Sequence, residues 1–135
     1  MQITITDLIE LAHGITNCGD LRGVKFSYAA AKSLKAANAE LETYNTERLK
    51  ICAEFALKDD DGAPKMKPEG EGDTAREVFD FGENEEAAKV ALNELSGMTV
   101  DVPIHQVLLD DMPAEITAGQ MSGIFNLIRE ESAGD

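Results

Sequence analysis

The fold is decided by one stretch, Ser27 to Leu57, which reads SYAAAKSLKAANAELETYNTERLKICAEFAL. It contains neither Gly nor Pro, and the helix formers Ala, Leu, Lys and Glu dominate it. Apolar side chains recur every three or four residues, and Arg48 interrupts this stripe once. The pattern predicts one long helix over residues 28–57, with Ser27 as its N-cap. Such a helix, about 45 Å long, needs a packing partner along its apolar stripe.

Upstream of this helix the sequence predicts three short elements. A short strand or cap comes first, and a helix follows it with Thr6 or Asp7 as the N-cap. Gly14 is the predicted end of that helix. Residues 14–23, with three glycines, read as a loop, and the alternation over residues 23–26 indicates a brief strand.

Downstream, an acidic turn ends the long helix. Asp61-Gly62 is a favourable tight-turn pair, and residues 59–76 are predicted to form a mobile acidic loop within the domain. Residues 77–81 alternate between polar and apolar side chains. We expect them to form a loose hairpin with the segment around Met66.

The last third of the chain contains two helical patterns and one strand pattern. Residues 83–95 are predicted to form a shorter helix, antiparallel to the long one. Residues 98–109 have strand character, and Pro103 makes this strand an edge or a bent one. Thr117 is positioned to cap a final helix over residues 118–129. The predicted fold is therefore α+β: a long helix paired with a shorter antiparallel helix, a small β-sheet or hairpin and a C-terminal helix, in a single domain over residues 1–135.

The net charge of −14 limits the classes of partner. Residues 59–86 carry eleven acidic and three basic side chains, whereas residues 20–58 carry five acidic and seven basic side chains. This surplus repels nucleic acid and anionic lipid, so we expect neither as a direct partner. No apolar run of 18 residues predicts a membrane span, and the N-terminus lacks signal-peptide features. Cys18 and Cys52 are interpreted as two free thiols in a reducing cytosol, and a disulfide between them is the alternative.

The sequence gives no support for catalysis or metal binding. A calcium loop centred on Gly62 would place Leu57 and Pro68 at its first and last ligand positions, where neither residue type can bind calcium. His13 and His105 belong to no metal-ligand spacing, and neither Ser-Gly pair forms a nucleophile elbow. We therefore predict a protein that is not an enzyme and has no cofactor, catalytic residue or metal ligand.

A small basic cluster is the one place where a small ligand is conceivable. It consists of Lys25, Ser27, Lys32 and Lys35. As a helix cap, Ser27 would leave free amides that, with the lysines, could bind an anion such as a nucleotide phosphate. The protein would then be one that sequesters an anion or a nucleotide. The alternative is a cap flanked by solvated lysines that balance acids elsewhere, and we favour this alternative.

Several motifs together resemble a family of short uncharacterised tailed-bacteriophage proteins. The motifs are VKFSYAAAK at residues 24–32, Glu47-Arg48-Leu49, KDDDG at residues 58–62, the helix-to-strand segment 93–102, and the helix that starts at Ile116-Thr117. The resemblance spans residues 24–128, although residues 70–81 match poorly. It implies a phage origin and an accessory role, with no catalytic residues to carry over. It also implies a location in the host bacterial cytoplasm or in the virion.

Two functions follow from these observations as hypotheses. The first is a virion or assembly accessory that binds phage or host proteins, or itself, through its long helix and outer strand. The predicted interaction surface is Tyr44, Arg48, Phe55, Val100, Val102 and Ile104. The second is an anti-defence or host-takeover inhibitor whose acidic block at residues 59–86 imitates phosphate charge.

Overall fold

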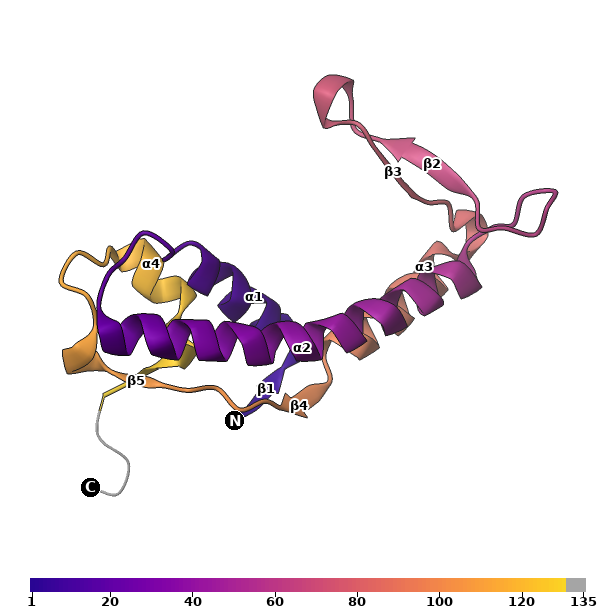
Figure 1. The fold of residues 1–135 in the computed structure, drawn as a ribbon. Coiled ribbons are helices and arrows are strands. Elements are labelled where there is room, and N and C mark those ends of the chain that lie inside the picture. Colours follow the sequence, from indigo (N-terminus) through magenta and orange to yellow (C-terminus); the bar gives the residue numbers. More distant parts are fainter. Residues whose placement is uncertain (131–135) are drawn as a thin grey trace. The chain divides into compact units, whose positions relative to one another are not determined.

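The computed structural model describes residues 1–130 and has the predicted α+β fold (Figure 1). Contacts divide the chain into two compact units. Unit 1 combines Met1–Thr43 with the chain from Gly97 onward, and unit 2 is Tyr44–Ser96. The sequence predicted a single domain over residues 1–135. In the structure, unit 2 is inserted in sequence between the two parts of unit 1.

Unit 1 contains two small sheets made from distant segments. Strand β1 (Gln2–Thr4) pairs antiparallel with β4 (Thr99–Asp101), and β5 (Val107–Leu108) pairs parallel with β6 (Ile128–Arg129). Figure 1 shows β1 and β4 side by side. The strand predicted over residues 98–109 is therefore two short strands. Pro103 lies between them, where its missing amide hydrogen does not weaken a sheet.

Helix α1 (Ile5–Thr16) begins earlier and ends later than the sequence predicted. Its N-cap is Thr4, whose Oγ1 accepts a hydrogen bond from the Asp7 amide at 3.1 Å, so the predicted caps Thr6 and Asp7 lie inside the helix. Gly14 also lies inside it, although the sequence placed the end there. The position needs glycine for space, because an added Cβ would lie 2.2 Å from the carbonyl oxygen of Gly123.

Helix α2 (Val24–Phe55) is the long helix that the sequence predicted over residues 28–57, and it begins four residues earlier and ends two residues earlier. Gly23 adopts a φ of 142°, which L-amino acids rarely reach, and thereby allows the chain to enter the helix. The carbonyl oxygen of Gly23 accepts a hydrogen bond from the Ser27 amide at 2.8 Å. The prediction of Ser27 as the N-cap was therefore wrong, as was the strand over residues 23–26.

Helix α4 (Ala118–Gly123) is shorter than the helix predicted over residues 118–129. Thr117 caps it as predicted, and Gln120 completes a reciprocal capping box. After the helix, a 3₁₀ turn (Phe125–Leu127) leads directly into β6. The pairing of β6 with β5 thus replaces the last helical turns.

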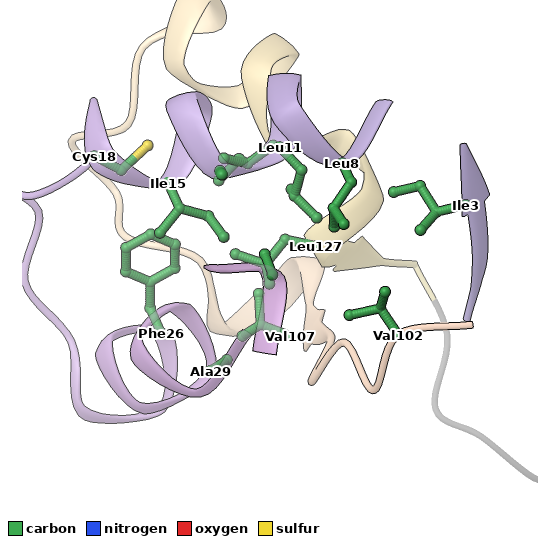
Figure 2. Packing of buried hydrophobic residues seen from close by; sticks show 13 residues of the cluster. Ile3, Leu8, Leu11, Ile15, Cys18, Phe26, Ala29, Val102, Val107 and Leu127 are labelled. Carbon is green, nitrogen blue, oxygen red and sulfur yellow. The ribbon is translucent and has the colours of Figure 1, made fainter. Parts of the chain in front are cut away.

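The main hydrophobic core lies in unit 1 (Figure 2). Ile15 of α1 lies beside Phe26 of α2, Leu11 of α1 points toward Leu127, and Leu127 has no exposed surface. Ser33 is also fully buried, within the helix that carries Phe26. Its Oγ donates to the backbone oxygen of His105 at 3.1 Å and accepts from the His105 amide at 2.8 Å. These bonds attach the irregular segment before β5 to helix α2.

Unit 2 contains the C-terminal part of α2 and three further elements. Strands β2 (Met66–Glu69) and β3 (Arg76–Phe79) form the predicted hairpin, with Met66 opposite Phe79. Helix α3 (Glu85–Ser96) forms the predicted antiparallel pair with the end of α2. The Asn84 side chain, just before α3, donates to the Phe55 carbonyl at 3.1 Å. The predicted loop 59–76 includes β2 and a 3₁₀ turn, so part of it is regular structure.

Candidate functional site

The four residues predicted to bind an anion, Lys25, Ser27, Lys32 and Lys35, do not converge in the structure. Ser27 offers no free capping amide, because its amide is bonded within the first turn of α2. Lys32 lies with its Nζ 5.6 Å from the centre of the Tyr28 ring, in cation–π range. Lys35 is exposed on the same helix. Only Lys25 lines a cavity that other charged side chains share.

This cavity, which we call the Lys25 cavity, lies in unit 1 and has a volume of about 180 Å³. It is bounded by the start of α2, by the segment around β5 and by β6. Its polar lining residues are Lys25, Tyr28, His105, Gln106, Asp111 and Arg129. The sequence analysis did not connect these residues, since Lys25 and Arg129 are more than a hundred positions apart.

Three contacts define the chemistry of the Lys25 cavity. Lys25 Nζ lies 3.5 Å from Asp111 Oδ1. The Tyr28 and His105 rings meet edge to face, with centres 5.4 Å apart. Arg129 faces Leu108 across the parallel strand pair, and its Nε is buried without a hydrogen-bond partner within residues 1–130. The cavity thus combines one carboxylate with two cations, and one of these cations, Arg129, has an unpaired donor.

A second, larger concavity lies in unit 2, and we call it the hairpin groove. It has a volume of about 470 Å³ and lies between the β2–β3 hairpin and the two helices of unit 2. Both apolar and charged side chains line it, among them Arg48, Met66, Arg76, Phe79, Phe81 and Leu92. Arg48, the charged residue in the apolar stripe of α2, therefore lines a groove, and its guanidinium donates to Asn45 Oδ1 at 2.9 Å.

The predicted interaction surface is divided by the structure. Tyr44, Arg48 and Phe55 lie in unit 2 and are all half-buried. Val100, Val102 and Ile104 lie in unit 1. There Val102 is only 1% exposed and belongs to the core, while Val100 and Ile104 pack against it. The prediction of Val102 as a surface residue was wrong, because the segment after β4 turns its apolar side chains toward unit 1.

Unit 2 has a much smaller interior than unit 1. Among its described residues, the hydrophobic side chains that are fully buried are all small: Cys52, Ala56 and Ala88. Larger apolar side chains remain exposed, with Met66 at 43% and Val90 at 65%. No large side chain at the centre of unit 2 is therefore sealed from water.

Cysteine and histidine chemistry offers no further site in the described part of the chain. Cys18 and Cys52 are free and buried. Burial raises the pKa of the Cys18 thiol, and the nearby Asp20 carboxylate raises it further, which disfavours the reactive thiolate. Within residues 1–130, no three His, Cys, Asp or Glu side chains are grouped to hold a metal ion. Over the same residues, no helix has the length and apolar character required to cross a membrane.

Comparison with models of known protein families, with curated proteins and with solved structures found no match to this chain. The resemblance to phage proteins therefore stays a prediction, and the functional argument depends on the geometry of the two units.

Proposed function

We propose that this chain is a non-enzymatic accessory protein of a tailed bacteriophage, a virion or assembly component that binds another protein through unit 2. The observation that carries the proposal is the incomplete interior of unit 2, where Cys52, Ala56 and Ala88 are the fully buried hydrophobic residues among those described. The resemblance over residues 24–128 supports the phage origin. Its action would take place in the host cytoplasm or within the particle.

The exposed apolar area of unit 2 makes a partner energetically favourable. Fully burying one large apolar side chain contributes roughly 1.5–3 kcal/mol. Met66 and Val90 are largely exposed, and Tyr44, Phe55 and Phe79 are half-buried. A partner that covered several of these side chains would gain several such contributions, which is the usual basis of a hot spot.

The β2–β3 hairpin suggests how a partner could bind. Each of its strands pairs with one neighbour within the described chain. Strand β3 therefore leaves an outer row of backbone donors and acceptors, whereas Pro68 removes one donor from β2. An extended segment of another protein could add a strand there and place alternate side chains in the hairpin groove. Backbone hydrogen bonds would supply affinity, and the groove would supply specificity.

The charge of unit 2 indicates the chemistry of the partner. Unit 2 contains fourteen acidic and seven basic residues, a net charge of −7. This charge disfavours a second copy of the same chain at long range and attracts a basic partner. We therefore propose an extended, net basic segment with alternating apolar side chains, from a phage or host protein.

The test compares one groove variant with one control. Met66→Glu introduces a charge into the hairpin groove, and Val24→Glu introduces the same charge at an 89% exposed position of unit 1. Each tagged protein is recovered from infected cells, the partner is identified by mass spectrometry, and the purified pair is measured by calorimetry. We expect Met66→Glu to weaken binding at least tenfold and Val24→Glu to leave it unchanged. Equal binding by both variants, or a strict monomer absent from particles and assembly complexes, contradicts the proposal.

The acidic turn after α2 favours one second candidate, an inhibitor that occupies a basic nucleic-acid-binding surface. Asp59 Oδ1 accepts hydrogen bonds from the Asp61 and Ala63 amides at 2.9 and 3.0 Å, and this fixes the turn. Asp60 and Asp61 remain exposed on it. A complex driven by such charges weakens steeply as salt rises. Host-protein recovery that stays constant from low to high salt would exclude this function.

A further inference from the structure

We propose that the Lys25 cavity of unit 1 binds inorganic phosphate. This site is separate from the hairpin groove and does not depend on the protein-binding function proposed for unit 2. It also differs from the predicted cluster of lysines around a helix cap, because the second cation is Arg129.

The first argument is the concentration of positive charge. Unit 1 has five Lys and Arg side chains and twelve acidic ones. Two of the five cations, Lys25 and Arg129, line this one cavity of about 180 Å³. An arginine fork binds two oxyanion oxygens at once, and a lysine adds a flexible point charge. Lys25 is 75% exposed at its side chain, so it can reorient toward a ligand.

The second argument is the unpaired donor. The Nε of Arg129 is buried and has no hydrogen-bond partner within residues 1–130. Buried charged donors are almost always paired, because desolvation without a partner is costly. A phosphate oxygen in the cavity would provide the missing acceptor.

The third argument is that the cavity wall is held in place. The His105 backbone is fixed by both hydrogen bonds to the buried Ser33, and the His105 ring packs against Tyr28. Gln106 donates through its side chain to the Asn126 carbonyl at 3.1 Å. A preformed site loses less entropy when a small ion binds.

Asp111 selects among oxyanions. Its carboxylate lies 3.5 Å from Lys25 Nζ. An ionised carboxylate accepts hydrogen bonds but cannot donate them, so it repels an oxyanion that carries no proton. Free phosphate keeps a proton as a dianion and can donate it to Asp111. Sulfate has no such proton, and a phosphomonoester above its second pKa of about 6 has lost its own. The cavity should therefore prefer inorganic phosphate to both.

The test is a titration of the intact protein at pH 7.5 with phosphate, sulfate and glycerol phosphate, followed by calorimetry and by the ¹⁵N–H signal of the Arg129 Nε. We expect phosphate to bind and to shift that signal, with sulfate and glycerol phosphate weaker. Lys25→Ala should weaken phosphate binding roughly 10- to 100-fold, the value of one charged hydrogen bond. Lys35→Ala, which removes the same charge from the same helix, should change the dissociation constant for phosphate by no more than about twofold.

Asp111→Asn tests the selection separately. It should bring the sulfate and phosphate affinities together, because an amide can donate to either ion. Arg129→Gln should abolish binding, and its folding can be checked from the remaining amide signals. Absence of phosphate binding to the natural chain overturns the site, as does equal weakening by Lys25→Ala and Lys35→Ala. A natural chain that binds sulfate as tightly as phosphate overturns the role of Asp111.

Discussion

The contact between helices α1 and α4 makes Gly14→Ala an informative substitution. In unit 1, a Cβ at residue 14 would lie 2.2 Å from the Gly123 carbonyl oxygen, 2.6 Å from its carbon and 3.0 Å from Ile124 Cγ2. Two of these atoms belong to the backbone, so no side-chain rotation can remove the clash. The helices must separate, and Ile124, which has no exposed surface, must move with them.

The expected loss in the free energy of unfolding of Gly14→Ala is the difference between two opposing effects. Alanine in place of glycine inside a helix stabilises by about 0.5–1 kcal/mol. Overpacking a well-packed core costs about 1–3 kcal/mol, and a backbone clash at Gly123 belongs at the upper end. Gly14→Ala should therefore lower the free energy of unfolding by about 2 kcal/mol, which corresponds to a fall of roughly 8–16 °C in Tm for a unit of this size.

Urea and thermal unfolding followed by circular dichroism measure the effect. Gly119→Ala is the matched control, since it also places alanine in a helix, and its nearest contact would be the Thr117 Oγ1 at an ordinary 3.9 Å. This control should be neutral or slightly stabilising. If Gly14→Ala proved as stable as the natural protein, the close approach of α1 and α4 would be refuted.

Three further predictions concern the interior of unit 1. Ser33→Ala removes the hydroxyl that pairs with the part-buried backbone amide and carbonyl of His105, and this should cost about 1–3 kcal/mol in urea unfolding. The control Ser27→Ala, at an exposed position, should stay within about 0.5 kcal/mol. Leu127→Ala should lower the free energy of unfolding by about 2–5 kcal/mol. The control Leu49→Ala, at a side chain that is 42% exposed, should lower it much less, and similar losses for the two variants would contradict the assigned core. Because burial raises the pKa of Cys18 above its ordinary 9.0, the unfolded thiol ionises first, so stability should fall above about pH 9. Cys18→Ala should reduce that fall, and an unchanged pH profile would count against this assignment.

Elements defined by local sequence could be predicted well. The long helix, the shorter antiparallel helix and the hairpin opposite Met66 each follow from patterns within a few turns or residues of sequence. Helix ends were predicted less well, because contacts from elsewhere in the chain determine them. The local sequence marks Gly14 as a helix end, but Gly14 lies inside the helix because Gly123 packs closely against it. The local sequence marks Ser27 as a cap, but the Ser27 amide already bonds to the Gly23 carbonyl within the helix.

The candidate sites were also predictable only where they depend on residues close together in the sequence. Lys25 was predicted from its neighbours in sequence, but the cavity that it lines also requires Asp111 and Arg129. The parallel pairing of β5 with β6 brings Arg129 there, and a two-residue strand has too few side chains for a recognisable alternating pattern. The prediction that Val102 lies on the surface was wrong for a related reason. The alternation of side chains along a strand does not indicate which face of the strand the rest of the protein covers.

The pairing of β1 with β4 has a consequence for the order of events on the ribosome. Residues 2–4 leave the ribosome before their partner residues 99–101, which are translated almost a hundred residues later. At about 5–20 residues per second, the first strand waits on the order of 5–20 s for its sheet. The whole of Tyr44–Ser96 is translated during that interval. All of unit 2 can therefore leave the ribosome before the β1–β4 sheet of unit 1 has formed.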